Sequence, residues 1–171
     1  MALTSFVILL RAVNVGGTGK LPMAELKSMC ERAGLTDVRT YIASGNVVCH
    51  STLTQARVKT LIETSLADYA GKPVGVAVRS GDEMAAVLAA NPFPDAAPNQ
   101  TAAIFLDSAP PADTLAHLSG QKNETVMLGK REIYVHYPDG MGQSKLKIAA
   151  AKAGTARNMN TIATLAEWAK A

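Results

Sequence analysis

The sequence predicts an α+β fold in which short strands and helices alternate along 171 residues. Apolar residues make up 48% of the chain, which is enough for a substantial core. Charged residues make up 18%, which is too few for a disordered chain. Segments with the alternation of strands and segments with helical spacing follow one another, separated by turn signals built on Gly, Pro and Asn.

The first eighty residues predict six elements in the order β-α-β-β-α-β. Phe6 to Leu10 is a continuous apolar run, which is typical of a central strand, and Pro22 suits the first turn of a helix that Gly34 ends. The other expected elements are strands at 38–42, 47–50 and 74–78, and a helix between Thr54 and Gly71. That order is the split βαβ, or ferredoxin-like, arrangement.

The second half repeats much of this pattern. Ser80 to Glu83 forms a capping box that opens a helix, Asn91-Pro92 breaks it, and residues 95–100 have linker composition. Beyond the linker we expect strands at 102–106, 124–128 and 132–137 and helices at 111–118, 143–153 and 161–169. The sequence therefore predicts two ferredoxin-like halves, residues 1–94 and 95–171, that form an α/β sandwich. The second half is expected to end in an extra helix where a last strand would complete the repeat.

Composition restricts the class of protein. The net charge of +3 is compatible with anionic ligands but falls short of the concentrated basic face of a dedicated nucleic-acid binder. Two cysteines are too few for a disulfide scaffold or a tetrahedral metal site, and the three histidines lack ligand spacing, so no metal is expected. The N-terminal apolar run stops at Arg11, unlike a signal peptide or a membrane span. We therefore expect a cytoplasmic protein with reduced thiols and no membrane partner.

The stretch from Arg11 to Lys20 is the strongest candidate for a binding site. It joins the first strand to the first helix, and its glycines leave amide groups uncovered near a helix N-terminus, where anions bind. It is not a Walker A loop, because Asn14 stands where the first Gly belongs and Leu21 follows the lysine. It is not a dinucleotide fingerprint either, because Pro22 replaces the third Gly. An anion-binding loop and a plain long connection both remain open.

A second constellation lies near the C-terminus. Thr155 to Thr161 is dense in hydrogen-bonding groups just before a predicted helix, and Asn158 and Asn160 are candidate helix caps. Arg157 is harder to explain as a cap, because its planar guanidinium suits carboxylate or phosphate. Lys147 and Lys152 are interpreted as the solvated face of a helix.

Nucleophilic catalysis is an alternative with a weaker pattern. Ser144 and Lys147 match S-x-x-K, but the order of the accompanying elements differs from that of the serine enzymes that carry this motif. Ser44 or Ser144 would be the nucleophile, with Lys145 as base or electrostatic stabiliser.

Five segments in order resemble one bacterial family, known as domain-of-unknown-function family 1697. Leu9 to Gly17 is similar to its LLRGINVGG opening and Thr40 to Val48 to its TYIQSGNVVF segment; the later signatures match residues 91–93, 142–146 and 155–161. The resemblance implies two ferredoxin-like halves and supplies no activity. This chain departs from the family pattern at Ala12, Ala43 and Met159, where the family usually has Gly, Gln and Trp.

Together these patterns predict a binding or regulatory module for a phosphate-bearing small ligand or nucleotide, held without a cofactor at a cleft between the halves. No RNA-recognition pattern is present, so a small ligand is favoured over nucleic acid. An enzyme acting on a small polar metabolite and a structural protein without a ligand site remain alternatives. The expected ligand-binding residues are Arg11, Asn14, Gly16, Gly17, Lys20, Ser44, Asn46, Ser144, Lys145, Arg157, Asn158 and Asn160.

Overall fold

The structure is a computed structural model that describes residues 3–11, 21–41, 45–71 and 73–170. Its contacts group the chain into two compact units, Met1–Ala85 with Leu165–Ala171, and Ala86–Thr164. Helices α3 (Gly81–Ala89) and α4 (Met159–Trp168) each have residues in both units. The grouping therefore does not test whether residues 1–94 and 95–171 are separate domains, and that division stays a prediction.

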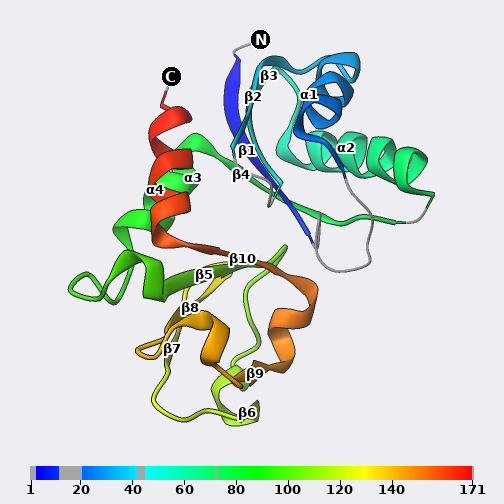
Figure 1. The fold of residues 1–171 in the computed structure, drawn as a ribbon. Coiled ribbons are helices and arrows are strands. Elements are labelled where there is room, and N and C mark those ends of the chain that lie inside the picture. The colour runs from blue at the N-terminus through cyan, green and yellow to red at the C-terminus, as the bar shows by residue number, and fades with distance from the viewer. Residues whose placement is uncertain (1–2, 12–20, 42–44, 72, 171) are drawn as a thin grey trace. The chain divides into compact units, whose positions relative to one another are not determined.

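The first unit contains the expected β-α-β-β-α-β order. A four-stranded sheet has the strand order β2-β3-β1-β4, and every neighbouring pair is antiparallel. Helices α1 and α2 lie on one face of this sheet (Figure 1). The elements are β1 (Thr4–Leu10), α1 (Met23–Arg32), β2 (Thr36–Tyr41), β3 (Asn46–Ser51), α2 (Gln55–Ala70) and β4 (Val76–Ser80).

Local sequence explains where these elements begin and end. Strand β1 is central, and its residues from Ser5 to Leu10 are all buried, as the continuous apolar run predicts. Helix α2 begins after Thr54, whose hydroxyl accepts a hydrogen bond from the Arg57 amide at 3.2 Å. It ends at Gly71, which takes the left-handed conformation that glycine adopts without strain.

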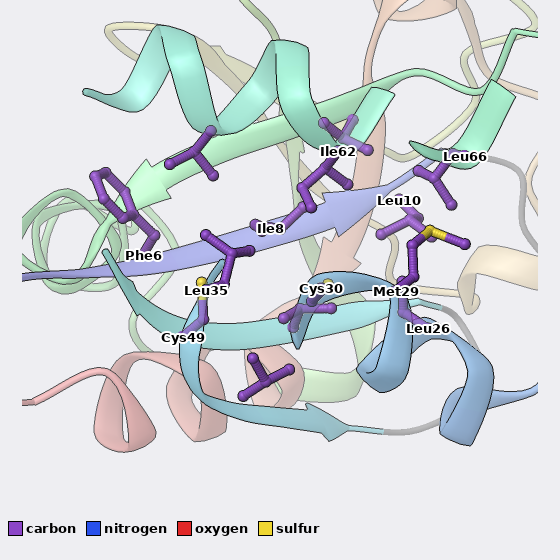
Figure 2. Close-up of a cluster of buried hydrophobic side chains, with 14 of the residues drawn as sticks. Phe6, Ile8, Leu10, Leu26, Met29, Cys30, Leu35, Cys49, Ile62 and Leu66 are labelled. Atoms are coloured by element: carbon purple, nitrogen blue, oxygen red, sulfur yellow. The ribbon is translucent and has the colours of Figure 1, made fainter. Parts of the chain in front are cut away.

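The core of the first unit fills the space between the sheet and its two helices. Alternate residues of β1 point into it, and side chains of α1 and α2 meet them from the other side (Figure 2). Cys30 and Cys49 both belong to this cluster, and burial raises the pKa of each thiol to about 12. Both cysteines are free and serve as small apolar side chains.

The second unit has a sheet with the strand order β10-β5-β8-β7, again antiparallel throughout. When the strands of each sheet are counted along the chain, both sheets have the order 4-1-3-2. The expected structural repeat is thus confirmed: the chain has two α/β halves of one topology. The strands are β5 (Thr101–Phe105), β7 (Thr125–Leu128), β8 (Glu132–His136) and β10 (Thr155–Asn158).

Three expectations for the second half are wrong. The helix expected at 111–118 is only the 3₁₀ turn η2 (Thr114–His117). The helix expected at 143–153 is replaced by η3 (Met141–Gln143), β9 (Lys147–Ile148) and η4 (Ala149–Ala153). The last strand, which the sequence pattern lacks, is present as β10 just before α4 and completes the sheet.

Tertiary pairing explains these differences. Strand β9 pairs with β6 (Leu118–Ser119) in a two-stranded ribbon, which overrides the helix-favouring Ala and Lys of this segment. The ribbon and η4 pack on the apolar face of the second sheet through Leu118, Ile148 and Ala151. The sequence does not predict β10, because the buried residues of this strand are polar: Thr155 and Arg157. The segment therefore lacks the apolar alternation of a strand.

Candidate functional site

Two of the sequence motifs meet at one end of the first sheet. The Leu10 amide, at the end of β1, donates to the carbonyl of Gly45 at 2.8 Å. The Arg11 amide donates to the carbonyl of Gly75, just before β4, at 3.0 Å. The start of the Gly-rich stretch therefore lies beside the turn between β2 and β3 and beside the beginning of β4. We call this end of the first sheet the motif end and define it by Arg11, Gly45, Asn46 and Gly75.

Asn46 holds the motif end together from within. Its side chain is fully buried, and its Nδ2 donates to the carbonyl of Tyr41 at 2.9 Å, across the turn of the β2–β3 hairpin. Asn46 is also opposite Leu9 in the pairing of β3 with β1. This geometry favours a role for Asn46 in stabilising the turn of the β2–β3 hairpin rather than in direct contact with a ligand.

Charged side chains gather at the same place. A Cβ atom added to Gly75 would lie 3.8 Å from Arg11 Cδ and 3.8 Å from Glu63 Oε2. Glu63 Oε2 accepts from Lys59 Nζ at 2.7 Å and from the Val76 amide at 3.1 Å, and Lys59 also donates to the carbonyl of Val76 at 2.8 Å. Arg11, Lys59 and Glu63 together carry a net charge of +1.

Five of the expected ligand-binding residues adjoin the motif end in sequence but lie outside the described residues: Asn14, Gly16, Gly17, Lys20 and Ser44. Arg11 directly precedes residues 12–20 and Gly45 directly follows residues 42–44, and both lie at the motif end. Their part in binding stays a prediction, and so does the expectation that the Gly-rich stretch and the Arg157 segment share one site.

Arg157 lies in the last strand of the second sheet and is 7% exposed. Its Nη1 donates to Thr155 Oγ1 at 2.6 Å and to the Ala156 carbonyl at 2.9 Å. Burial lowers the pKa of the guanidinium to about 10. These bonds tie Arg157 to its own strand, so the described contacts give it a structural role.

The two asparagines that follow Arg157 differ in environment. Asn158 Oδ1 accepts a hydrogen bond from the Thr161 amide at 2.9 Å, which is an N-cap of α4. Asn160 is exposed, and its backbone carbonyl accepts from Thr164 Oγ1 at 3.1 Å. The capping interpretation thus accounts for Asn158.

Arg79 is a buried arginine that the sequence analysis missed. It is 1% exposed, lies opposite Val7 in the β1–β4 pairing, and its Nη1 donates to the Val78 carbonyl at 3.0 Å. Arg157 lies at the matching place of the repeat, opposite Ala103 in the β5–β10 pairing. Each arginine precedes a helix-capping residue, Ser80 or Asn158. An arginine directly before a helix cap in both halves is the signal that could have revealed the pair.

Ser144 belongs to a hydrogen-bonded turn. Its Oγ donates to Glu124 Oε2 at 2.6 Å and accepts from the Leu146 amide at 3.1 Å, while the Lys122 amide donates to Glu124 Oε1 at 2.7 Å. The hydrogen bond from the Ser144 hydroxyl lowers the pKa of Glu124 most, followed by backbone hydrogen bonds that include the one from the Lys122 amide. A carboxylate with a lowered pKa is a poor general base, so the geometry favours a structural role for this serine.

Lys145, the expected base, follows Ser144 with an exposed side chain, and its backbone carbonyl lies against Gly120. No group of three or more His, Cys, Asp or Glu side chains among the described residues could hold a metal ion. No helix in this part of the chain has the length and apolar character to cross a membrane.

The model of a family described as "Protein of unknown function (DUF1697)" matches residues 3–134. The chain belongs to this family. A conserved bacterial protein, SP0830 from Streptococcus pneumoniae, has a similar solved structure, with 26% sequence identity and a TM-score of 0.82. The similarity covers 99% of this chain and 100% of that one, and the resemblance found in the sequence is confirmed. No curated protein matches the chain.

Proposed function

We propose that this protein binds a small phosphate-bearing ligand, such as a nucleotide, at the motif end of its first sheet. The observation that carries the proposal is the hydrogen bond between the Leu10 amide and the Gly45 carbonyl. It joins two segments that lie more than thirty residues apart in the sequence: the glycine-rich stretch from Arg11 to Lys20, and the turn Ser44-Gly45-Asn46, whose side chains offer hydrogen-bond donors.

The chemistry of these residues suits a phosphate group. The guanidinium of Arg11 can donate two parallel hydrogen bonds to phosphate oxygens. Glycine amides in the adjoining stretch from Gly16 to Gly19 can approach an anion closely, and Lys20 adds a further positive charge. Buried Asn46 holds the Tyr41 carbonyl, and the Lys59–Glu63 pair holds the backbone of Val76, which follows Gly75 of the motif end.

A thermal-shift experiment on the full chain tests the proposal. Nucleotides and sugar phosphates are each compared with the same compound without phosphate. A ligand at a hundred times its Kd stabilises by about 2.7 kcal/mol, which for a chain of this size raises Tm by about 5–10 °C. We expect such a rise with at least one phosphorylated compound and none with its dephosphorylated form.

Two arginine variants sharpen the test. Arg11→Ala should abolish most of the rise in Tm, because it removes the cation at the motif end. Arg57→Ala removes an exposed arginine from α2 and should leave the rise unchanged. If no phosphorylated compound raises Tm at millimolar concentration, or if Arg11→Ala responds like the unaltered protein, the proposal is wrong.

A further inference from the structure

The second unit contains a depression that belongs to none of the motifs discussed above. It lies along the ribbon of β6 and β9 and the adjoining turns η2 and η4, and its volume is about 420 Å³. Pockets for small ligands typically measure about 300–1,000 Å³. We call this depression the ribbon pocket.

The lining of the ribbon pocket is positively charged on one part and apolar on another. Lys147 and Lys152 supply two ammonium groups, and His117 and Ser119 add a ring nitrogen and a hydroxyl. None of the described residues that line it is acidic. Asp113 is a nearby carboxylate, with its Oδ2 3.1 Å from His117 Nε2. Ile148, Ala149 and Ala151 supply the apolar part.

The backbone around the ribbon pocket is fixed by close contacts. Gly120 follows β6 with φ +68°, and a Cβ atom there would collide with the backbone carbonyl of Lys145. The Ser144–Glu124 hydrogen bond holds the chain just before β9. Ile148 is 8% exposed and anchors β9 in the core of the second unit. Lys147 therefore lies on a strand whose backbone is fixed by contacts before it and at Ile148. A fixed backbone lowers the entropy lost when a ligand binds.

We propose that the ribbon pocket binds a small organic phosphate monoester. Such a group carries close to two negative charges at neutral pH, which matches the two lysines. The apolar part of the lining then contacts the organic part of the ligand. The proposal concerns residues of the second unit alone and does not rest on the function proposed for the motif end.

A site-resolved NMR titration of the full chain tests this proposal, with adenosine 5′-monophosphate as the probe. We expect saturable shifts of the Ser119, Lys147 and Ile148 amides. Adenosine and inorganic phosphate should each bind more weakly than the monophosphate, because each offers only one part of the complementarity. Equal affinity for inorganic phosphate and the monophosphate would overturn the proposal of an organic ligand.

Charge variants complete the test. Lys147→Gln and Lys152→Gln should each weaken binding of the monophosphate about tenfold, the usual effect of losing one charge-assisted hydrogen bond. Lys130→Gln, an exposed lysine in the β7–β8 turn, is the matched control and should leave the Kd unchanged. Arg11→Ala should also leave these shifts unchanged, which separates this site from the motif end. No saturable shift, or shifts that both lysine variants leave intact, would overturn the proposal.

Discussion

At the scale of single residues, several polar side chains that suggested ligand binding have hydrogen-bond partners within the protein. Asn46, Asn158 and Ser144 each hold a turn or a helix end through a short hydrogen bond. A hydrogen bond to backbone at a cap is what Asn and Ser supply most often. Substitution of these residues should therefore act first on stability, by lowering the free energy of unfolding.

Asn158 offers a direct measurement of this role. Asn158→Ala removes the acceptor of the Thr161 amide and should lower the free energy of unfolding by about 1 kcal/mol, while Asn158→Asp should retain most of it. Asn160→Ala is the matched control, because that side chain is exposed on the same helix. Urea denaturation measures the free energy of unfolding of the three variants. Equal losses in Asn158→Ala and Asn160→Ala would contradict the capping role.

The hydrogen bond between Ser144 and Glu124 predicts that the stability of the protein depends on pH. Because the pKa of Glu124 is lowered from its usual value of 4.5, ionised Glu124 stabilises the folded state above about pH 4.5, and this stabilisation disappears as pH falls through the lowered pKa. Ser144→Ala removes the largest cause of that shift. The variant should be less stable than the unaltered protein at neutral pH, and the difference should narrow below about pH 4.5.

Urea denaturation at a series of pH values measures this difference. Ser108→Ala, at an exposed position in the same unit, is the control and should show a difference that does not vary with pH. A Ser144→Ala difference that is constant from neutral to acid pH would show that the hydroxyl does not act through the ionisation of Glu124.

At the scale of elements, the first half follows closely from its sequence, while parts of the second half do not. Apolar runs and caps predict β1 and α2 because their buried positions are apolar. Strand β10 has Thr155 and Arg157 buried instead, and β9 forms by pairing with a segment almost thirty residues away. The meeting of Leu10 with Gly45 likewise depends on the pairing of β1 with β3, which spacing alone does not reveal.

The ribbon of β6 and β9 depends on one glycine. Gly120→Ala should lower the free energy of unfolding by more than the cost of the left-handed conformation alone, about 1–2 kcal/mol, because its Cβ would also collide with the Lys145 carbonyl. Gly140→Ala is the matched control: φ there is +89°, and nothing lies within 4 Å of the added Cβ. Chemical denaturation compares the two variants, and equal losses would mean that Gly120 contributes only its conformation.

At the scale of the whole molecule, the chain uses one strand order twice and covers the two sheets differently. In the first unit the helices α1 and α2 pack on the sheet; in the second, a short ribbon and 3₁₀ turns do so. The repeat extends to buried Arg79 and Arg157, each two residues before its helix. The repeated topology carries two different proposed sites, the motif end in the first unit and the ribbon pocket in the second.

Binding of a phosphate group at the motif end is tested most directly by site-resolved NMR titration with the phosphorylated compound that raises Tm. We expect the largest shifts at the amides of Arg11, Gly45 and Val76. The opposite end of the same sheet, where Thr4 pairs with Ser51, should remain unchanged. Saturation of the protein without a shift at Arg11, Gly45 and Val76 would contradict the claim.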